Sequence, residues 1–426
     1  MQKLKVEIEY KGNFVHAGDI VGTDSSDACF LYDEEYMSNA AYKPLSISLP
    51  FKEEPFTAAQ TRCYFESLLP EGFTKKCVAD RIKADESDYL SILSCLGNEC
   101  IGAVRIAESE ASVPEPAYSK WTDDDLLAFA REGAVKSAQI LTNTHLSLAG
   151  ASGKTGLYYD EENKTWYLPL GTAPSTHIVK QSHIRLKKIV LNERLCLLTA
   201  ARLGIETPES FAVDTGSGEE NILFATRRYD RVFSRSGRII SGKKAPARLH
   251  QEDFAQAMGI PSGNKYEKEN KGYLKKIFEI LLRNSSNALE DMLKVWDICI
   301  FNYFIGNTDN HIKNLSIIYN EDFTKLRLAP AYDIVSTVVY DSHSQDMSLS
   351  IGGEYNIRKI TRDSFEQEAE NIGLGKKIAM KRFDRMAGSF KQALIRSGKE
   401  LEEKSADPEV KKMCEKILSC GGLSEI

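Results

Sequence analysis

The stretch FNYFIGNTDNHIKNL, residues 301–315, places a polar loop rich in Gly and Asn between two strongly apolar runs. The run VWDICIFNYFIG leads into the loop, and LSIIY leaves it. A loop of this polarity between apolar segments is more typical of a functional site than of a plain surface turn. Within the loop, Asp309 and Asn314 stand at the spacing D-x-x-x-x-N. The sequence therefore predicts a site here.

The D-x-x-x-x-N spacing is that of the protein-kinase catalytic loop, where the Asp serves the acceptor hydroxyl and the Asn binds magnesium. The usual H-R before the Asp is missing, because Asn307 and Thr308 stand there. Downstream, the segment LAPAYD ends at Asp333, where a second magnesium-binding Asp is expected. Mg²⁺ prefers hard oxygen ligands. The spacing thus predicts Asp309 as the catalytic residue and Asn314 and Asp333 as metal ligands.

A second cluster, SLAGASGKTG at residues 147–156, is rich in Gly and Ala, which allow backbone N–H groups to approach a phosphate closely. Its GKT is typical of a nucleotide-binding P-loop, but the spacing is wrong. Gly150 lies only three residues before Gly153, and Leu148 stands where the first Gly belongs. The remaining interpretations are a phosphate loop of another kind and a plain turn.

Lys180 ends the alternating strand THIVK. A lysine at a strand end can pair with nucleotide phosphates, and a solvated lysine is the alternative. Glu193, at the start of the next helical segment, is the candidate carboxylate partner. The order of the clusters is Gly-rich loop, lysine, acidic helix, D-x-x-x-x-N and Asp, which is the order in a two-lobed kinase.

Composition excludes several other classes of protein. The 426 residues include 55 basic and 61 acidic side chains, and the net charge of -6 does not favour nucleic acid as a direct ligand. The nine cysteines form no C-x-x-C pair, so neither a zinc site nor a disulfide framework is expected. No apolar span approaches the length of a membrane helix. We therefore expect a cytoplasmic protein without a membrane partner.

Hydrophobic periodicity predicts a β-rich N-terminal module, a mixed middle region and an all-helical C-terminal lobe. Together with the order of the clusters, this predicts an α+β, bilobal protein-kinase-like fold. Strands are expected at residues 3–9, in ACFLY, LSISLP and THIVK, and as a hairpin in TGLYYDEENKTWYLPL. IVLNERLCLLTAARLG is expected to be helical. The predicted domains are an N-terminal module (1–107, β-rich then helical), a connecting segment (108–140), a kinase N-lobe with the Gly-rich loop and Lys180 (141–249), and a helical C-lobe with the catalytic loop (250–426).

The chain resembles the HipA-type serine/threonine kinases, which are toxins of bacterial toxin–antitoxin modules, over nearly its whole length. The resemblance rests on motifs that stand in the family's order: KPLSISLP, FESLLPEG, SLAGASGKT, THIVK, NERLCLLTAARLGI, RRYDR, RLHQEDFAQAMGIPSGNKYE, IGNTDNHIKNLS and LAPAYDIVS. Two departures occur. The resemblance implies that residues 227–229 form the hinge, whose backbone groups would meet adenine, but Arg227 opens it where an acidic residue is expected. In the Gly-rich loop, Ser152-Gly153 precede Lys154.

The resemblance implies roles for individual residues. Asp309 would be catalytic, and Asn314 and Asp333 would hold Mg²⁺. Ser147 matches the family's autophosphorylated serine, and a phosphate there would add negative charge beside a phosphate loop and switch the enzyme off. The residues implied in ATP binding are Ala149, Gly150, Ala151, Ser152, Gly153, Lys154, Lys180, Arg227, Arg228, Tyr229, His311, Ile312, Lys313 and Asn314.

The resemblance also implies ATP and Mg²⁺ as cofactors and an antitoxin with a helix-turn-helix DNA-binding domain as partner, so that DNA is reached only through the antitoxin. The implied substrate is a protein hydroxyl, such as one on an aminoacyl-tRNA synthetase, and its phosphorylation would inhibit translation and growth. Two alternatives stay open from the sequence: a catalytically weak kinase-like corepressor that acts with the antitoxin, and a kinase of a non-protein acceptor.

Overall fold

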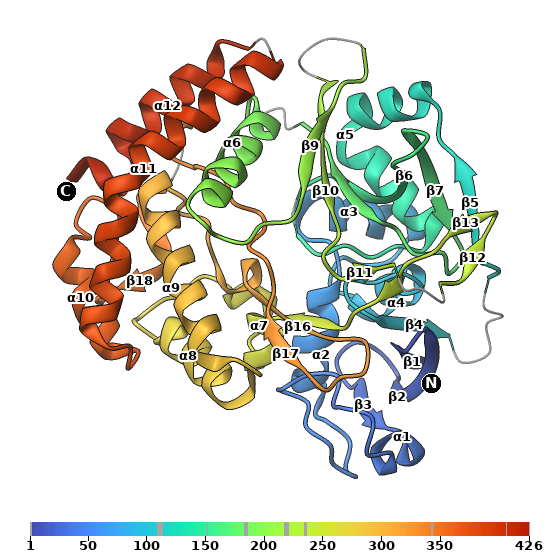
Figure 1. Cartoon of the computed structure of the whole chain (residues 1–426). Helices are drawn as coiled ribbons and strands as arrows, with labels where there is room; N and C mark the ends of the chain where they lie inside the picture. The colour runs from blue at the N-terminus through green and yellow to red at the C-terminus, as the bar shows by residue number, and fades with distance from the viewer. Residues whose placement is uncertain are drawn as a thin grey trace. The chain divides into compact units, whose positions relative to one another are not determined.

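The computed structural model describes residues 2–108, 114–150, 152–182, 186–216, 221–233, 237–341, 344–405 and 407–425. The chain divides into two compact units (Figure 1). Unit 1 comprises Met1–His183, Ser210–Ser262 and Ile317–Leu326. Unit 2 comprises Ile184–Glu209, Gly263–Ser316 and Arg327–Ile426. Within the described residues, no helix combines the length and apolar character needed to cross a membrane.

Unit 1 begins with an antiparallel four-stranded sheet in the order β3-β2-β1-β4. The alternation in KLKVEIE buries Leu4, Val6 and Ile8 on one face, which confirms the strand predicted there. The elements of this module are β1 (Gln2–Tyr10), β2 (Asn13–Gly22), β3 (Cys29–Tyr32), α1 (Glu34–Ser38), α2 (Ala58–Phe65), α3 (Gly72–Ile82), α4 (Tyr89–Leu96) and β4 (Val104–Glu108).

The strand predicted in LSISLP is wrong, because this segment makes a turn in which Leu49 N donates to Ser46 O. The Ser46 hydroxyl and the Ile47 backbone amide both donate to the Glu252 carboxylate. Glu252 is buried, and burial raises its pKa to about 8. Polar groups of this segment therefore donate to a carboxylate about 205 residues away and not to a neighbouring strand. Hydrophobic periodicity does not reveal such a distant contact.

A second sheet of unit 1 is antiparallel and has the order β5-β7-β6-β8-β10-β9. Its strands are β5 (Ala117–Lys120), β6 (Lys154–Asp160), β7 (Thr165–Leu170), β8 (His177–Lys180), β9 (Ser210–Val213) and β10 (Leu223–Arg227). The predicted hairpin is confirmed as β6–β7, and THIVK is confirmed as β8.

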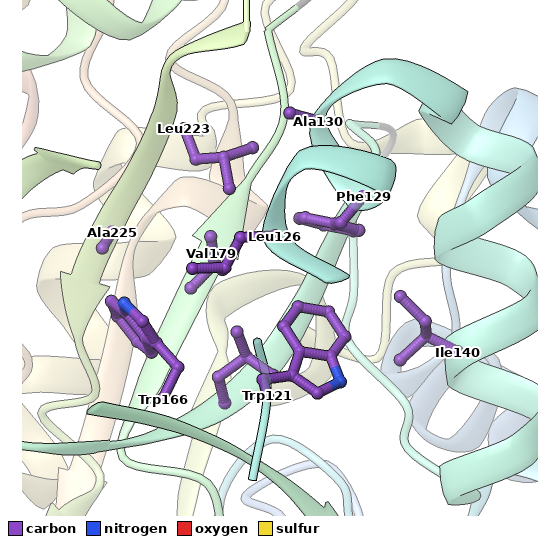
Figure 2. Close-up of a cluster of buried hydrophobic side chains, with 10 residues drawn as sticks. Trp121, Leu126, Phe129, Ala130, Ile140, Trp166, Val179, Leu223 and Ala225 are labelled. Atoms are coloured by element: carbon purple, nitrogen blue, oxygen red, sulfur yellow. The ribbon is translucent and has the colours of Figure 1, made fainter. Parts of the chain in front are cut away.

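Helix α5 (Asp123–Thr144) packs against this second sheet. Figure 2 shows side chains of the helix and of the strands meeting in one buried cluster: Trp121, Leu126, Phe129, Ala130, Ile140, Leu157, Trp166, Val179, Leu223 and Ala225. Residues 117–144, most of which were expected to form a connecting segment, thus form β5 and α5. The apolar positions of WTDDDLLAFA explain the difference, since they cover the sheet. The fourfold domain division otherwise stays a prediction.

Short elements complete the middle of the chain. Strand β11 pairs with β14, β12 pairs with β13, and β15, β16 and β17 follow one another in a three-stranded sheet. These elements are β11 (Arg231–Val232), β12 (Ile239–Ile240), β13 (Lys243–Lys244), β14 (Ala247–Arg248), β15 (Gln251–Asp253), α7 (Phe254–Met258), β16 (Ser316–Tyr319) and β17 (Leu326–Leu328).

Unit 2 is mainly helical. Most residues of its central helix α9 are buried, and the indole N–H of Trp296 donates to Ala379 O at 3.1 Å. The predicted all-helical C-terminal lobe needs a correction, because β18 and β19 pair in an antiparallel hairpin. The elements are α6 (Ile189–Arg202), α8 (Tyr273–Asn284), α9 (Ala288–Ile305), β18 (Asp346–Ile351), β19 (Glu354–Asn356), α10 (Arg362–Asn371), α11 (Lys376–Ser405) and α12 (Glu409–Cys420).

Candidate active site

Two lysines of unit 1 share one face of the six-stranded sheet. Lys154 begins β6 and Lys180 ends β8, and the antiparallel register pairs them directly. Directly paired residues point to the same face, with Cβ atoms about 4.5–5.5 Å apart. Lysine ammonium groups form charge-assisted hydrogen bonds with phosphate oxygens. The pair is therefore suited to bind a phosphate.

Glycines shape the loop that precedes this pair. Gly150 has a φ of +103°, and a Cβ built on it would lie 2.6 Å from Lys154 Nζ. A Cβ on Gly153 would lie 2.1 Å from Gln181 Oε1. A side chain at Gly153 would therefore displace a buried amide, and one at Gly150 would need a strained backbone. The other predicted loop residues are Ala149 and Ser152, both half-buried, and Ala151, which lies outside the described residues.

Gln181 holds the loop to α5, and the motifs in the sequence did not indicate it. Its backbone N donates to Gly153 O at 2.9 Å, and its Nε2 donates to Phe129 O at 2.6 Å and to Gly133 O at 2.8 Å. The backbone of α5 is non-helical at Gly133. The Gln181 amide therefore satisfies carbonyls released by this break in the helix. The one signal in the sequence that could have indicated Gln181 is its position directly after Lys180.

Ser147 is buried at the start of the loop. Its Oγ donates to Leu68 O at 2.7 Å, and its backbone N donates to Glu99 O at 2.8 Å. Further on, Glu71 N donates to Gly150 O at 3.0 Å. All three partners belong to the N-terminal module. This module therefore holds the start of the predicted phosphate loop in place.

The three residues predicted as the hinge lie at the end of β10, the strand next to β8. Arg227 forms an exposed ion pair with Glu161 at 3.5 Å. The backbone N of Arg228 donates to Thr176 O at 2.8 Å, so this amide is already engaged within the unit. Tyr229 donates its hydroxyl to a glutamine of β15. The three residues thus border the sheet that carries the lysine pair.

The side chain of Arg228 belongs to a buried charge cluster, which contains Glu9, Glu99, Arg228, Asp230, Arg231 and Arg248. Glu99 is central, because it accepts from Arg231 at 2.8 Å, from Arg248 at 2.7 Å and from Arg228 at 3.3 Å. Burial opposes ionisation of Glu99, yet the three guanidinium groups lower its pKa to about 2. Three of the five residues of the motif RRYDR, namely Arg228, Asp230 and Arg231, thus serve the interior, and the sequence did not distinguish them from the hinge.

In unit 2, the loop predicted to be catalytic presents a single exposed residue. Every residue from Val295 to Ser316 is buried except Asp309. The loop follows α9, whose C-terminus is Gly306 with a φ of +68°. A Cβ on Gly306 would lie 2.5 Å from a methyl group of Val338, so only Gly fits. The fold therefore brings one carboxylate to the surface of an otherwise buried segment.

Hydrogen bonds to nearby side chains fix the backbone at Asp309. Its N–H donates to Asn307 Oδ1 at 3.0 Å, and Asn307 Nδ2 donates to Asn302 Oδ1 at 2.7 Å. The N–H of Thr308 donates to Thr337 Oγ1 at 3.0 Å. Asn307 and Thr308, which replace the usual H-R, thus build the loop by amide and hydroxyl contacts. The role of these two residues could not be deduced from the motif.

Asn314 and Asp333 have the donor chemistry for Mg²⁺. Asn314 Nδ2 donates to Asp309 O at 3.1 Å, which leaves the amide oxygen as the atom for a cation. Asp333 is exposed, and its φ of +54° places it in the left-handed region. Backbone in that region is costly and recurs at functional sites. Tyr332, next to Asp333, donates to Lys313 O at 2.8 Å and so links the two segments.

The described residues contain no group of three or more His, Cys, Asp or Glu side chains that could hold a metal ion. Magnesium in kinase sites relies instead on one or two carboxylates together with substrate phosphates. One carboxylate and one amide, as in Asp333 and Asn314, fit that pattern.

The other predicted residues of the catalytic loop, His311, Ile312 and Lys313, are buried, with Ile312–Asn314 in a 3₁₀ turn. Glu193 is buried in α6 of unit 2, whereas Lys180 belongs to unit 1. The pairing of Glu193 with Lys180 stays a prediction. The approach of Lys154 and Lys180 to Asp309 stays a prediction as well. Tyr266 was not predicted, and its hydroxyl donates to Asp309 Oδ1 at 2.8 Å.

Two family models match the chain. The model described as HipA-like C-terminal domain matches residues 146–394, and the model described as HipA N-terminal domain matches residues 10–107. The first match alone covers more than half of the chain. It contains the glycine loop, the lysine pair and the catalytic loop.

Among relatives, the kinase candidate Y4mE of Sinorhizobium fredii is 30% identical over 390 residues, which are 89% of this chain and 90% of the relative. The serine/threonine-protein kinase toxin HipA of Shewanella oneidensis is 24% identical over 89% of this chain and 88% of its own length. A structure of HipA from Shewanella oneidensis, solved with HipB and operator DNA, superposes with a TM-score of 0.80 at 20% identity and covers 97% of this chain and 96% of its own. This chain and that structure share the α+β kinase-like fold. On the family model and the relatives, the chain belongs to the HipA family of kinases.

Proposed function

We propose that the protein is an ATP- and Mg²⁺-dependent serine/threonine protein kinase of the toxin type. The observation that carries the proposal is the exposure of Asp309 alone within a buried, hydrogen-bonded loop. A buried polar loop needs hydrogen-bond partners for its many donors and acceptors. Asp309 is the one residue of the loop that the fold leaves exposed, which indicates a role at the surface. The position suits a residue that must meet an acceptor from solvent.

The transfer itself is a displacement at phosphorus. The acceptor hydroxyl oxygen forms a bond to the γ-phosphorus, the bond from that phosphorus to the β,γ-bridging oxygen breaks, and ADP leaves with the electron pair. Asp309 orients the hydroxyl and takes its proton. Asn314 and Asp333 would hold Mg²⁺, which neutralises phosphate charge. Lys154 and Lys180 would bind phosphate oxygens, and the loop 149–154 would supply backbone N–H groups.

The basic test uses the full chain with Mg²⁺ and γ-labelled ATP, alone and with a cell lysate, followed by mass spectrometry of labelled sites. We expect label on serine or threonine of at least one protein. A chain that binds ATP but labels nothing would disprove the kinase activity and favour the corepressor alternative.

Replacing Lys180 by Met is expected to weaken ATP binding by about tenfold or more, because a charge-assisted hydrogen bond contributes about 1.5–3 kcal/mol. Met removes the ammonium group, whose Nζ lies 5.5 Å from the centroid of the Phe224 ring, and keeps an unbranched side chain. Calorimetric titration with ATP and Mg²⁺ measures the effect. Lys164→Met, in the exposed β6–β7 turn, is the matched control and should bind ATP as the wild type does. Equal affinity of the Lys180 variant and the wild type would remove Lys180 from the site.

Autophosphorylation at Ser147 is proposed as the off-switch. Its hydroxyl is buried and bonded to Leu68 O, so a phosphoryl group has no room while the loop start stays against the N-terminal module. We expect Ser147→Asp to release this segment and lower ATP affinity by about tenfold or more, since an unpaired carboxylate is costly to bury. Ser147→Ala removes the hydroxyl without adding charge and should retain most binding. Indistinguishable affinities of the two variants would contradict the switch.

The partner is proposed to be an antitoxin with a helix-turn-helix domain. Support comes from the Shewanella oneidensis HipA structure, which contains HipB and operator DNA. DNA would be reached only through the antitoxin. The proposed substrate is a protein hydroxyl, such as one on an aminoacyl-tRNA synthetase, whose modification would stop translation and growth. A cytoplasmic location agrees with nine cysteines that are all free thiols.

A further inference from the structure

A pocket of about 670 Å³ opens beside Asp309, and all of the residues that line it belong to unit 2. Asp309, Tyr266 and Thr308 form one part of its wall, and Met347 and Ser348 of β18 form another. Pockets of this size accommodate small molecules or a few side chains of a protein segment. The pocket is therefore a place where a group can approach the exposed carboxylate.

Tyr266 already occupies the hydrogen-bonding position on this carboxylate. Its hydroxyl donates to Asp309 Oδ1 at 2.8 Å. The edge of its ring meets the His311 ring, with centroids 5.2 Å apart at an interplanar angle of 80°. Yet the residue is 41% exposed. The phenol is thus bonded at its tip while much of the side chain faces solvent.

The backbone around Tyr266 is fixed to the same strand that supports the catalytic loop. Glu267 N donates to Ser348 O at 2.9 Å, and Ser348 Oγ donates to Thr308 O at 2.7 Å. The buried Glu267 carboxylate accepts from Ser350 N at 2.9 Å. Strand β18 therefore sets the spacing between Tyr266 and Asp309. Rotation of the exposed tyrosine side chain, without any backbone change, is enough to break the bond.

We propose that the Tyr266 hydroxyl holds the place of the acceptor hydroxyl on Asp309 and must be displaced before phosphoryl transfer. This inference rests on the proposed kinase function. A hydroxyl that yields its proton to a general base must lie about 2.6–3.2 Å from the carboxylate oxygen, which is where the phenol lies. Tyr266 thereby discriminates between acceptors. Water competes poorly with the phenol for Asp309, whereas a serine or threonine that the pocket positions replaces the phenol.

The test compares wild type with Tyr266→Phe, using water as the probe acceptor. ADP release from Mg²⁺ and ATP is measured without a protein substrate. Since a hydrogen bond to a charged group is lost, we expect the Phe variant to hydrolyse ATP about tenfold faster, with the KM for ATP unchanged. A lower rate would overturn the proposal, because it would mean that Tyr266 positions Asp309 for catalysis. An unchanged rate, or phosphate found on Tyr266 itself, would also overturn it.

Tyr273→Phe is the matched control. Its hydroxyl donates to Asn264 O at 3.0 Å, so the variant also removes one phenol hydrogen bond from this region, but none to Asp309. Its hydrolysis rate should equal that of wild type; an equal rise in both variants would overturn the proposal in favour of a loosened loop. A wild type that neither hydrolyses ATP nor labels protein overturns the kinase function and this inference together. An active wild type with no gain in Tyr266→Phe overturns this inference alone.

Discussion

Replacing Asp309 by Asn is expected to lower phosphoryl transfer by about 10³-fold while ATP binding is retained, because general acid–base catalysis contributes about 10²–10⁴-fold. The amide has nearly the shape of the carboxylate, and the backbone bonds of the loop do not involve the changed atoms. The side-chain amide of the Asp309→Asn variant, however, cannot take the proton of an acceptor hydroxyl. Initial rates with γ-labelled ATP measure the loss, and calorimetric titration measures ATP affinity.

Asp384→Asn provides the matched control. This carboxylate also lies in unit 2 and is exposed, and it pairs with Arg362 at 2.9 Å. Exposed ion pairs contribute little to stability, so the control should transfer phosphate at the wild-type rate. If Asp309→Asn retained more than about a tenth of the activity, Asp309 would not be the catalytic base. A variant that also lost ATP binding would show that the substitution had disturbed the structure of the loop and had not only removed proton transfer.

Local patterns in the sequence predicted the elements that carry the site. The alternation in THIVK and TGLYY predicted strands β8 and β6, and the structure shows that these two strands pair. Helical periodicity gave α6, which ends just before Gly204 with a φ of +83°. Asp309 and Asn314 were predicted because their separation is only five residues. These signals are all contained within one element or one loop.

The contacts that hold the site together were not predictable, because they join distant residues. Tyr266 lies 43 residues from Asp309, and the carboxylate of Glu99 meets Arg231, 132 residues further on. Neither pair is marked by any spacing rule. The turn at Ser46 was missed for the same reason, since Glu252 takes its donors. The sequence patterns thus marked the candidate site residues, and tertiary contacts determined how these residues are held.

Replacing Glu99 by Gln is expected to lower the free energy of unfolding by about 3–5 kcal/mol, the usual effect of removing one partner from a buried ion pair. The variant leaves Arg228, Arg231 and Arg248 buried with less negative charge among them. Urea unfolding followed by tryptophan fluorescence measures the change.

Glu161→Gln is the control for this prediction. Glu161 also faces an arginine, Arg227 at 3.5 Å, but its side chain is 60% exposed. Water and salt screen such a pair, so the stability should change by no more than about 0.5 kcal/mol. Similar losses in the two variants would show that burial of the Glu99 cluster adds nothing to stability.

The pH dependence of stability separates charge from packing at Glu99. Burial disfavours the ionised carboxylate, but Arg231, Arg248 and Arg228 outweigh it and lower the folded-state pKa from 4.5 to about 2. A group with a lowered folded pKa stabilises the fold above its unfolded pKa, and this contribution is lost as the pH falls from about 4.5 towards 2. Gln does not titrate, so the difference in unfolding free energy between wild type and Glu99→Gln should shrink over that interval. A difference that stayed constant from pH 6 to pH 3 would mean that the carboxylate contributes by shape and hydrogen bonding, and not by its charge.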